Sequence, residues 1–330
     1  MIETAFTRLI GVDHPVVSAG MGAGNADGEL AGRVSEAGGL GVIGASFLDA
    51  REVAEMITRS RAITPKPLGV NLLLFSNEHL LDGVLGANPA VLSTAWPSAD
   101  QDLKSIFAKA HERGIKVMHM VPTLDDAKKA AEAGADVIVA QGTEGGGHIG
   151  LMGTTVIVRQ VVKAVSPLPV LAAGGIADGA GLAAALALGA QGVLLGTRFY
   201  ATRECPAPED WKQAIVASDG HDTIVTSVPD SLTGRDWPGA WSRVVRTRFI
   251  EEWLGREPEV RRRRSELWAS LERAEAEGRL DYRVNHVGQS AGLIDAIQPA
   301  GDVVRQIVAE AEDVLRTTLP AMIKAAPVRA

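Results

Sequence analysis

A histidine follows three consecutive glycines in the stretch QGTEGGGHIG, which covers residues 141–150. Three adjacent glycines lose a large amount of chain entropy on folding, so their presence indicates a flat ligand pressed against bare backbone. A histidine side chain titrates near neutral pH, which suits proton abstraction. We therefore predict that His148 lies on a loop beside a ligand and acts as a general base. The alternative is a histidine that only forms hydrogen bonds within its own loop.

Glycines also follow two later apolar runs. Gly174 and Gly175 end the run PVLAAGG, and Gly196 and Thr197 follow the run GVLL. Glycine lets the backbone approach an anion closely, and the free N–H groups at the start of a helix favour negative charge. The two loops therefore predict a phosphate-binding site. The alternative is that these glycines only form tight turns between strands and helices.

The elements that must position these residues are short apolar runs separated by helical patterns. The runs cover residues 15–21, 40–46, 68–74, 90–96, 116–122, 137–142, 169–175 and 192–199. Most are continuously apolar, which is typical of parallel strands buried on both faces. Eight such alternations predict an α/β fold with a (β/α)₈ TIM barrel, and an open doubly wound sheet is the alternative.

In a TIM barrel the active site lies at the C-terminal ends of the strands, where His148 and the glycine loops fall in this sequence. His119 lies within the fifth apolar run. If its side chain faces the barrel interior, His119 is a competing candidate for the base.

The pattern changes after residue 199. Five tryptophans and charged helical stretches follow, among them the run RRRRSELW at residues 261–268. They predict a smaller, mostly helical second subdomain that covers the barrel mouth. The arginine run is a solvated helix face or, alternatively, a phosphate contact. Residues 302–319 have helical apolar spacing and are expected to pack back on the barrel. We therefore divide the chain into residues 1–199, 200–288 and 289–330.

The composition is that of a globular protein, with 46% hydrophobic residues, 22% charged residues and a formal net charge of −7. A nucleic-acid surface needs concentrated positive charge, so we expect no nucleic-acid partner. The single cysteine, Cys205, fits a reducing compartment and is expected to be buried. We find no signal-peptide pattern and no run suited to a membrane span, so a cytoplasmic location is expected. No residues have metal-ligand spacing, and we expect no metal.

The motifs QGTEGGGHIG, LAAGGIADG and LLGTRF resemble, in this order and spacing, the signatures of the nitronate monooxygenase family, formerly called 2-nitropropane dioxygenases. The stretch GQSAGLI at residues 288–294 resembles the C-terminal return of that family to the barrel. The resemblance extends from residue 15 to the final helix and is weakest between residues 200 and 288. It implies an FMN-dependent oxidoreductase that oxidises alkyl nitronates with O₂ to a carbonyl compound and nitrite.

The resemblance also implies roles for single residues. His148 is the catalytic base. The residues implied to hold the phosphate of FMN are Gly174, Gly175, Gly196 and Thr197. Those implied to contact the isoalloxazine ring or its loop are Ala19, Gly20, Met21, Asn71, Gln141, Gly146 and Gly147. The alternatives are that Asn71 caps a turn and that Met21 only fills the core.

Three features leave other activities open. Many family members carry a lysine after the histidine of strand five, where this chain has Met120. The stretch GGHIG also resembles FMN-dependent enoyl-[acyl-carrier-protein] reductases, and ATRECP at residues 201–206 resembles NAD(P)H:quinone reductases. Both alternatives would use NAD(P)H, with an enoyl thioester or a quinone as the small-molecule substrate. A flavin-binding protein without turnover is a remote alternative, and the oligomeric state is open, with a homodimer as one option.

Overall fold

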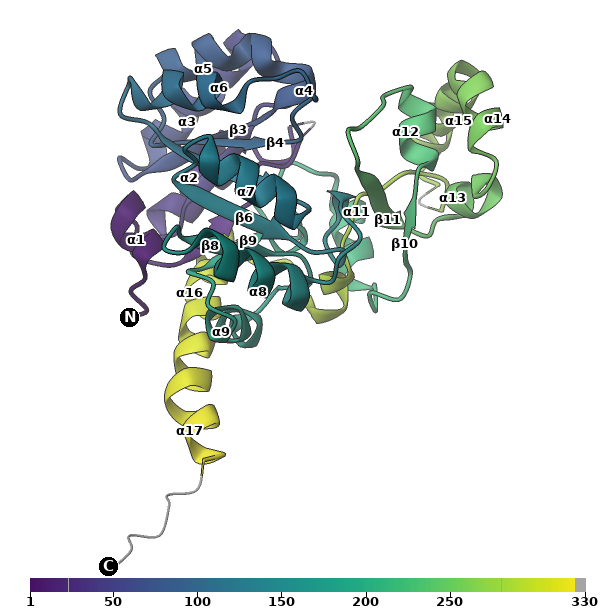
Figure 1. Cartoon of the computed structure of the whole chain (residues 1–330). Helices are drawn as coiled ribbons and strands as arrows, with labels where there is room; N and C mark the ends of the chain where they lie inside the picture. Colours follow the sequence, from purple (N-terminus) through teal and green to yellow (C-terminus); the bar gives the residue numbers. More distant parts are fainter. Residues whose placement is uncertain (23, 280, 324–330) are drawn as a thin grey trace, which may run out of the picture.

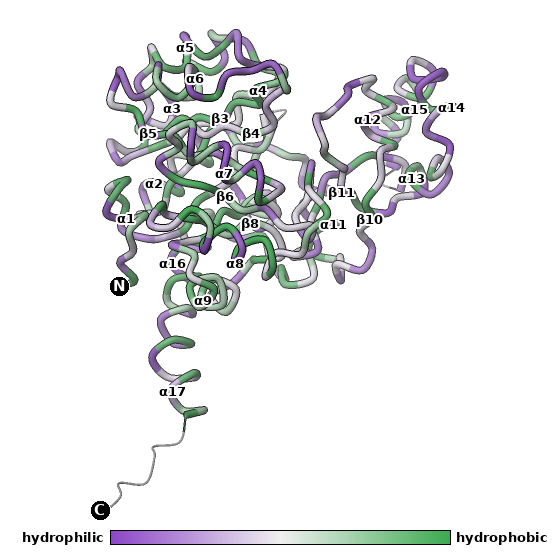
Figure 2. Tube along the Cα trace, in the orientation of Figure 1, coloured by the Kyte–Doolittle hydropathy of each residue, from purple (hydrophilic) through white to green (hydrophobic). Residues whose placement is uncertain are grey.

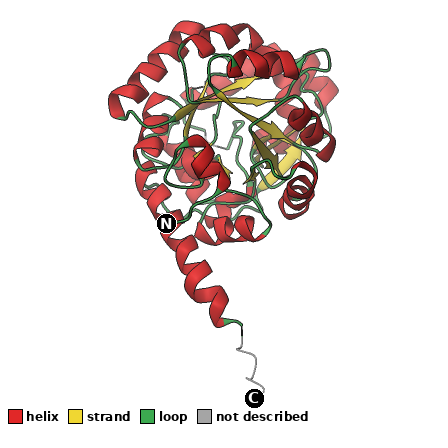
Figure 3. Ribbon diagram, turned by 60° about the vertical axis from the view of Figure 1, so that its left-hand side comes forward, coloured by secondary structure: helices red, strands yellow, loops and turns green. Residues whose placement is uncertain are grey.

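The computed structural model describes residues 1–22, 24–279 and 281–323, and eight parallel strands form its centre (Figures 1 and 3). The strands are β1 (Val16–Ser18), β2 (Gly41–Gly44), β3 (Leu68–Leu73), β4 (Val91–Ala95), β5 (Lys116–Val121), β6 (Val137–Gln141), β8 (Val170–Ala173) and β9 (Val193–Leu195). Their order in the sheet is β1-β9-β8-β6-β5-β4-β3-β2. A parallel bridge between Val17 and Leu40 joins β1 to the start of β2. The predicted barrel is confirmed, and the open sheet is wrong.

Helices surround the strands, as the view along the barrel shows (Figure 3). They are α1 (Ala5–Ile10), α2 (Gly28–Glu36), α3 (Ala50–Ile63), α4 (Leu74–Asn77), η1 (Glu78–Leu80), α5 (Leu81–Gly86), α6 (Leu103–His111), α7 (Leu124–Glu132), α8 (Thr154–Val165), α9 (Gly179–Ala187) and α10 (Thr197–Tyr200). Aspartates cap several of them; the carboxylate of Asp178, for example, accepts a hydrogen bond from Gly181 N at the start of α9. The strand predicted at residues 192–199 ends earlier than expected, because α10 begins at Thr197.

Side chains of the barrel strands alternate between two apolar layers. One cluster fills the barrel interior and includes Val17, Met118 and Val139, and α1 adds Phe6 to its N-terminal end. The other lies between strands and helices and includes Val117 and Val121. Because successive residues of a strand point to opposite sides, the inward or outward direction of each side chain follows from its place in this alternation.

His119 faces outward, so the expectation that it might line the barrel interior is wrong. It follows the inward-facing Met118, and its ring lies 5.6 Å from that of Phe107 on α6. Its Nδ1 is 2.7 Å from Thr94 Oγ1 on the neighbouring strand, and its side chain is 1% exposed. His119 is therefore a core residue and does not compete with His148 as a base.

Burial lowers the pKa of His119 to about 4. A histidine in the unfolded chain titrates near 6.5, so between these values the unfolded chain binds a proton that the folded chain does not. The contribution of neutral His119 to the free energy of unfolding is therefore fully present above about pH 6.5 and is lost as the pH falls toward 4. Between pH 7 and pH 5 the free energy of unfolding of the wild type falls, and we expect it to fall by about 2 kcal/mol less in His119→Gln. Urea unfolding at both pH values measures this difference. An unchanged loss would contradict this interpretation.

Residues after the barrel strands form an insert with its own apolar core, seen beside the barrel in Figure 1. Its helices are α11 (Glu209–Val216), α12 (Val228–Thr233), α13 (Arg248–Trp253), α14 (Glu257–Arg262) and α15 (Arg264–Ala276). Its strands β10 (Thr223–Thr226) and β11 (Trp241–Val245) form an antiparallel sheet with β7 (Gly147–Ile149), which comes from the loop after β6. The smaller, mostly helical subdomain is confirmed, but the sequence did not predict this sheet.

The arginine run of the insert is a solvated helix face, as the first interpretation held. Arg261 pairs with Asp236, and Arg263 pairs with Glu259 and Glu266. Figure 2 shows the hydrophilic character of α14 against the hydrophobic barrel strands. These arginines are therefore engaged in local ion pairs.

The chain returns to the barrel through η2 (Gln289–Leu293) and α16 (Ala300–Asp313), followed by η3 (Val314–Thr318) and α17 (Leu319–Ala321). Helix α16 packs against α9 and α2, and it ends at Asp313, before the end of the helix expected over residues 302–319. Cys205 is buried, as expected. No helix in the described ranges is long and apolar enough to cross a membrane.

Candidate active site

Three predicted site residues lie inward at the C-terminal ends of their strands. Ala19 follows the inward-facing Val17 of β1, and Gln141 follows Val139 of β6. Asn71 lies between two outward-facing residues of β3. Asn71 and Gln141 are 9% and 8% exposed. The structure therefore brings these side chains to one end of the barrel interior.

The polar groups of these residues differ in how they are satisfied. Asn71 Nδ2 donates a hydrogen bond of 3.0 Å to Ser93 Oγ. Gln141 Oε1 is buried and accepts no hydrogen bond from any described residue. A buried carbonyl oxygen without a donor is costly, so its presence at a barrel mouth indicates room for a ligand N–H.

The loop after β1 approaches β3 so closely that only glycine fits. A Cβ on Gly20 would lie 2.3 Å from Asn71 Cβ. This approach brings the Ala19–Gly20–Met21 backbone against the end of β3. The Met21 side chain packs against the outer apolar cluster, as the core-filling alternative held. The predicted contact of the Met21 backbone with a flavin stays a prediction.

The two glycine loops lie side by side because β8 and β9 are neighbours in the sheet. Gly174 and Gly175 have φ values of +96° and +74°, which residues with a side chain adopt only with strain. Among the described residues, the N–H groups of Gly174, Gly175 and Gly196 donate to no backbone carbonyl. Unpaired N–H groups on glycine-rich loops suit an anion.

The triple-glycine loop and the C-terminal return meet at the same place. A Cβ on Gly146 would lie 2.5 Å from Gly288 N, and that N–H donates a hydrogen bond of 3.0 Å to Thr197 Oγ1. Gly147 has open space on the side where a Cβ would lie. The structure therefore gathers the predicted residues of the loops after β6, β8 and β9.

Glu144, which had no predicted role, lies beside the glycine loop after β8. A Cβ on Gly175 would lie 3.1 Å from Glu144 Cβ. The Glu144 carboxylate accepts hydrogen bonds from Thr154 N at 2.9 Å and Thr154 Oγ1 at 2.7 Å. Its negative charge is thus bound at the N-terminus of α8, where a helix favours an anion.

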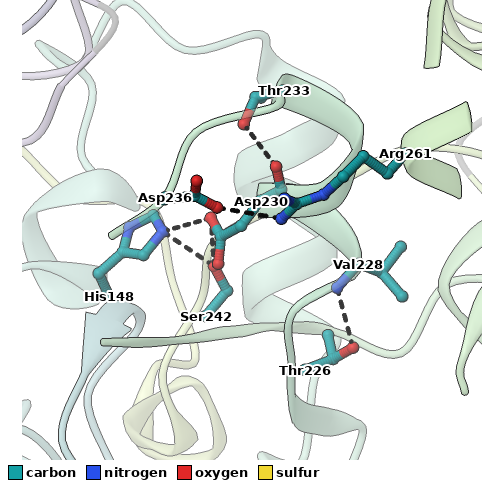
Figure 4. A network of polar contacts seen from close by, with 8 residues as sticks. All are labelled: His148, Thr226, Val228, Asp230, Thr233, Asp236, Ser242 and Arg261. Atoms are coloured by element: carbon teal, nitrogen blue, oxygen red, sulfur yellow. Dashed lines mark hydrogen bonds and ion pairs between the residues drawn. The ribbon is translucent and has the colours of Figure 1, made fainter. Parts of the chain in front are cut away.

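His148 lies in strand β7, so the expectation of a loop is wrong. The short strand GHI pairs with β11, and His148 lies opposite Ser242. His148 Nε2 is 2.7 Å from Asp230 Oδ1 and 3.0 Å from Ser242 Oγ (Figure 4). The side chains of His148 and Asp230 are only 13% and 12% exposed. The histidine is therefore held by the insert, and not only by its own loop.

A tryptophan covers one face of the His148 ring. The rings of Trp237 and His148 are stacked, with centroids 3.3 Å apart and planes 10° apart. Trp237 also contacts Phe75 after β3 and Trp96 after β4, at centroid distances of 4.7 and 6.3 Å. The segment of the insert that carries Trp237 therefore reaches the C-terminal ends of the barrel strands beside His148.

A second histidine lies near this cluster. The His286 ring centroid is 5.6 Å from that of His148. Desolvation by the surrounding protein lowers the pKa of His286, and a positive charge on His148 lowers it further. His286 is consequently neutral near pH 7. Neither it, nor Asp230, Ser242 or Trp237, was predicted as a site residue, because they belong to the region where the family motifs are weakest.

Comparisons with known proteins agree with this arrangement. The profile of the family described as "Nitronate monooxygenase" matches residues 3–84 and 79–310. A probable nitronate monooxygenase of Staphylococcus aureus (strain MSSA476) is 30% identical over 362 residues, covering 95% of this chain and 99% of the relative. The structure of FabK from Thermotoga maritima superposes with a TM-score of 0.87 and 36% identity, covering 98% of this chain and 100% of that chain.

A third relative has higher identity over a shorter stretch. It is the (3aS,4S,5R,7aS)-5-hydroxy-7a-methyl-1-oxo-octahydro-1H-indene-4-carboxyl-CoA dehydrogenase of Rhodococcus jostii (strain RHA1), 39% identical over 236 residues. The match covers 71% of this chain and 65% of that relative, so the chain matches about two thirds of its length. With the family profile matched over most of its residues, the chain is an oxidoreductase and belongs to the nitronate monooxygenase family.

Proposed function

We propose that this protein is an FMN-dependent oxidoreductase in which His148 moves a proton to or from a substrate carbon at the barrel mouth. The observation that carries this proposal is the position of His148. Its ring is bound to Asp230 and stacked on Trp237, beside the strand ends where the predicted cofactor residues gather. A histidine in such a place suits proton transfer to a substrate held over a flat ligand.

The residues present fit FMN. Gln141 Oε1, buried and without a donor, suits an N–H at the edge of a flavin ring. Within the described ranges, the N–H groups of Gly174, Gly175 and Gly196 donate to no backbone carbonyl and would suit its phosphate. The close approach of Gly20 to Asn71 brings the backbone of the loop after β1 to the same end of the barrel, where it would hold the ring. When bound, FMN supplies the transfer of hydride or single electrons. The chain supplies binding, orientation and the proton.

The chemistry of His148 limits the substrate. A histidine removes a proton from carbon, or returns one, only where a neighbouring group stabilises the carbanion, such as a thioester carbonyl or a nitro group. Trp237 covers one face of the ring and keeps water from it. Proton transfer from His148 therefore suits reduction or dehydrogenation next to an acyl thioester, and it suits oxidation of a nitroalkane.

We favour the acyl thioester as the substrate class. The likeness to FabK, an enoyl reductase, extends over both whole chains at 36% identity, and a CoA dehydrogenase is 39% identical over the shared part. The second candidate is oxidation of alkyl nitronates with O₂ to a carbonyl compound and nitrite. It is favoured by the family profile and by the relative of 30% identity that is matched over nearly its whole length.

Anaerobic mixing separates the two substrate classes. We expect NADH or NADPH to remove the visible absorbance of the bound flavin, and crotonyl-CoA to restore it, because an enoyl reductase takes its electrons from a nicotinamide. Spectra recorded in a stopped-flow instrument measure both steps. Retention of the absorbance with NAD(P)H, together with nitrite formation and O₂ uptake from propyl nitronate, would select nitronate oxidation. A flavin whose absorbance changes with none of these compounds, and with no quinone, would indicate a binding protein without turnover.

A further inference from the structure

We infer that Asp230 is a positioning residue that fixes the tautomer of His148, so that Nδ1 is the atom that exchanges the proton. This inference rests on the proposed role of His148. It adds a carboxylate from the insert, 82 residues away in the sequence, to a site whose motifs all lie on the barrel.

The hydrogen-bond partners of His148 Nε2 determine where its proton lies. Asp230 Oδ1 is 2.7 Å from Nε2, and a carboxylate only accepts hydrogen bonds. Ser242 Oγ lies 3.0 Å from Nε2 and 3.2 Å from the other carboxylate oxygen, Asp230 Oδ2. A serine that donates its single proton to Asp230 can only accept at Nε2. Nε2 must therefore carry a proton that it donates to Asp230. In neutral imidazole the lone pair then lies on Nδ1, the nitrogen that can take a proton from a substrate.

Nδ1 is left available. Within the ranges that the structure describes, no side chain forms a hydrogen bond with His148 Nδ1. Nδ1 is also not one of the fully buried polar atoms that lack a partner, so it is accessible from the site. The ring is also prevented from turning over. Trp237 stacks on one face, and Ser242 lies directly opposite His148 in the β7–β11 pair. A fixed ring with a fixed tautomer presents one nitrogen to the site.

The groups around His148 come from four places. Asp230 is on α12, Ser242 is on β11, Trp237 precedes β11, and His286 precedes η2. Among these side chains Asp230 is the one carboxylate, and desolvation lowers the pKa of His286. The positive charge that His148 gains with a second proton is therefore balanced by Asp230, as in other histidine–carboxylate pairs.

The tautomer is read directly by NMR of the protein labelled with ¹⁵N-histidine, with FMN bound and without it. His148→Gln identifies the His148 signals by their loss. The protonated and unprotonated nitrogens of a neutral imidazole have well-separated ¹⁵N shifts. We expect the proton on Nε2 in the wild type. In Asp230→Asn the amide can donate as well as accept, so we expect a mixture of both tautomers.

Kinetics give a second readout with the substrate identified by the mixing experiment. We expect Asp230→Asn to lower kcat by about tenfold or more, with a smaller change in KM and unchanged flavin content. Glu251→Gln is the matched control, because it removes an exposed carboxylate of the same insert without contact to His148. It should leave both the ¹⁵N spectrum and kcat unchanged.

A proton on Nδ1 in the wild type would overturn the inference without any variant, even if Asp230→Asn fails to fold. An unchanged tautomer and kcat in a folded Asp230→Asn would also overturn it. The proposed function fails separately, when His148→Gln retains full activity. In that case the tautomer would still report the Asp230 contact, so the two failures are distinguishable.

Discussion

His148→Gln is expected to lower kcat by about 10²-fold or more, because a positioned general acid or base contributes at least this much to proton transfer at carbon. Glutamine keeps a similar length and can still accept a hydrogen bond, but it does not exchange a proton near neutral pH. Flavin content should be unchanged, since His148 bonds to Asp230 and Ser242 of the insert. Steady-state kinetics and the visible spectrum of the same sample measure both quantities.

The matched control for this variant is His221→Gln, the same change at an exposed histidine of the insert. It should leave kcat unchanged. For the nitronate candidate, His148→Gln should lower turnover of the neutral nitroalkane by about 10²-fold or more and largely spare the pre-formed nitronate, which has no proton to lose. Equal losses on both forms would assign His148 to binding and contradict its role as a base.

The barrel could be predicted because each of its strands and helices is marked by a pattern within a short stretch of sequence. Most of the strands, such as Val137–Gln141, are apolar on both faces, and the alternation of a strand with a helical segment recurs along the barrel part of the chain. The glycine motifs could be placed as well, since strand ends of a parallel barrel share one edge. The structure accordingly brings Gly146, Gly174 and Thr197 together from three loops.

The antiparallel sheet of the insert could not be predicted, because its strands depend on each other. The three residues of β7, Gly147–Ile149, include a glycine and have no strand pattern of their own. They become a strand only by pairing with β11, which begins 92 residues after β7 ends. A pairing at that separation leaves no trace in local hydrophobic periodicity.

The partners of His148 were missed for the same reason. Asp230 and Ser242 lie 82 and 94 residues from His148, with no spacing that marks them as its neighbours. The sequence shows the tryptophans of the insert, but nothing in it indicates that Trp237 stacks on the histidine of β7. The direction of His119 is also a result of the structure, which places Met118 in the interior cluster and so turns the side chain of His119 to the opposite side.

Gly175→Val is expected to give protein purified without FMN, or to weaken FMN binding by about tenfold or more. The substitution strains the backbone at a positive φ and places a side chain where the phosphate would bind. The φ of +74° costs a residue with a side chain about 1–2 kcal/mol, and the new Cβ would lie 3.1 Å from Glu144 Cβ. The added methyl groups would also block an anion from the loop N–H groups. Gly114→Val is the matched control, because Gly114 has a φ of +72° with nothing within 4 Å of its would-be Cβ. It should lose comparable stability and keep its flavin.

The flavin content of the purified wild type, with the identity of the released chromophore, tests the proposed function most directly. We expect yellow protein that releases one FMN per chain on denaturation without a covalent bond. FMN-depleted protein should regain a higher Tm when FMN is added, because a ligand that binds only the folded chain stabilises it. Colourless protein whose Tm does not respond to FMN would contradict the assignment of the loops at Gly174, Gly175, Gly196 and Thr197 to a flavin phosphate, and with it the proposed function.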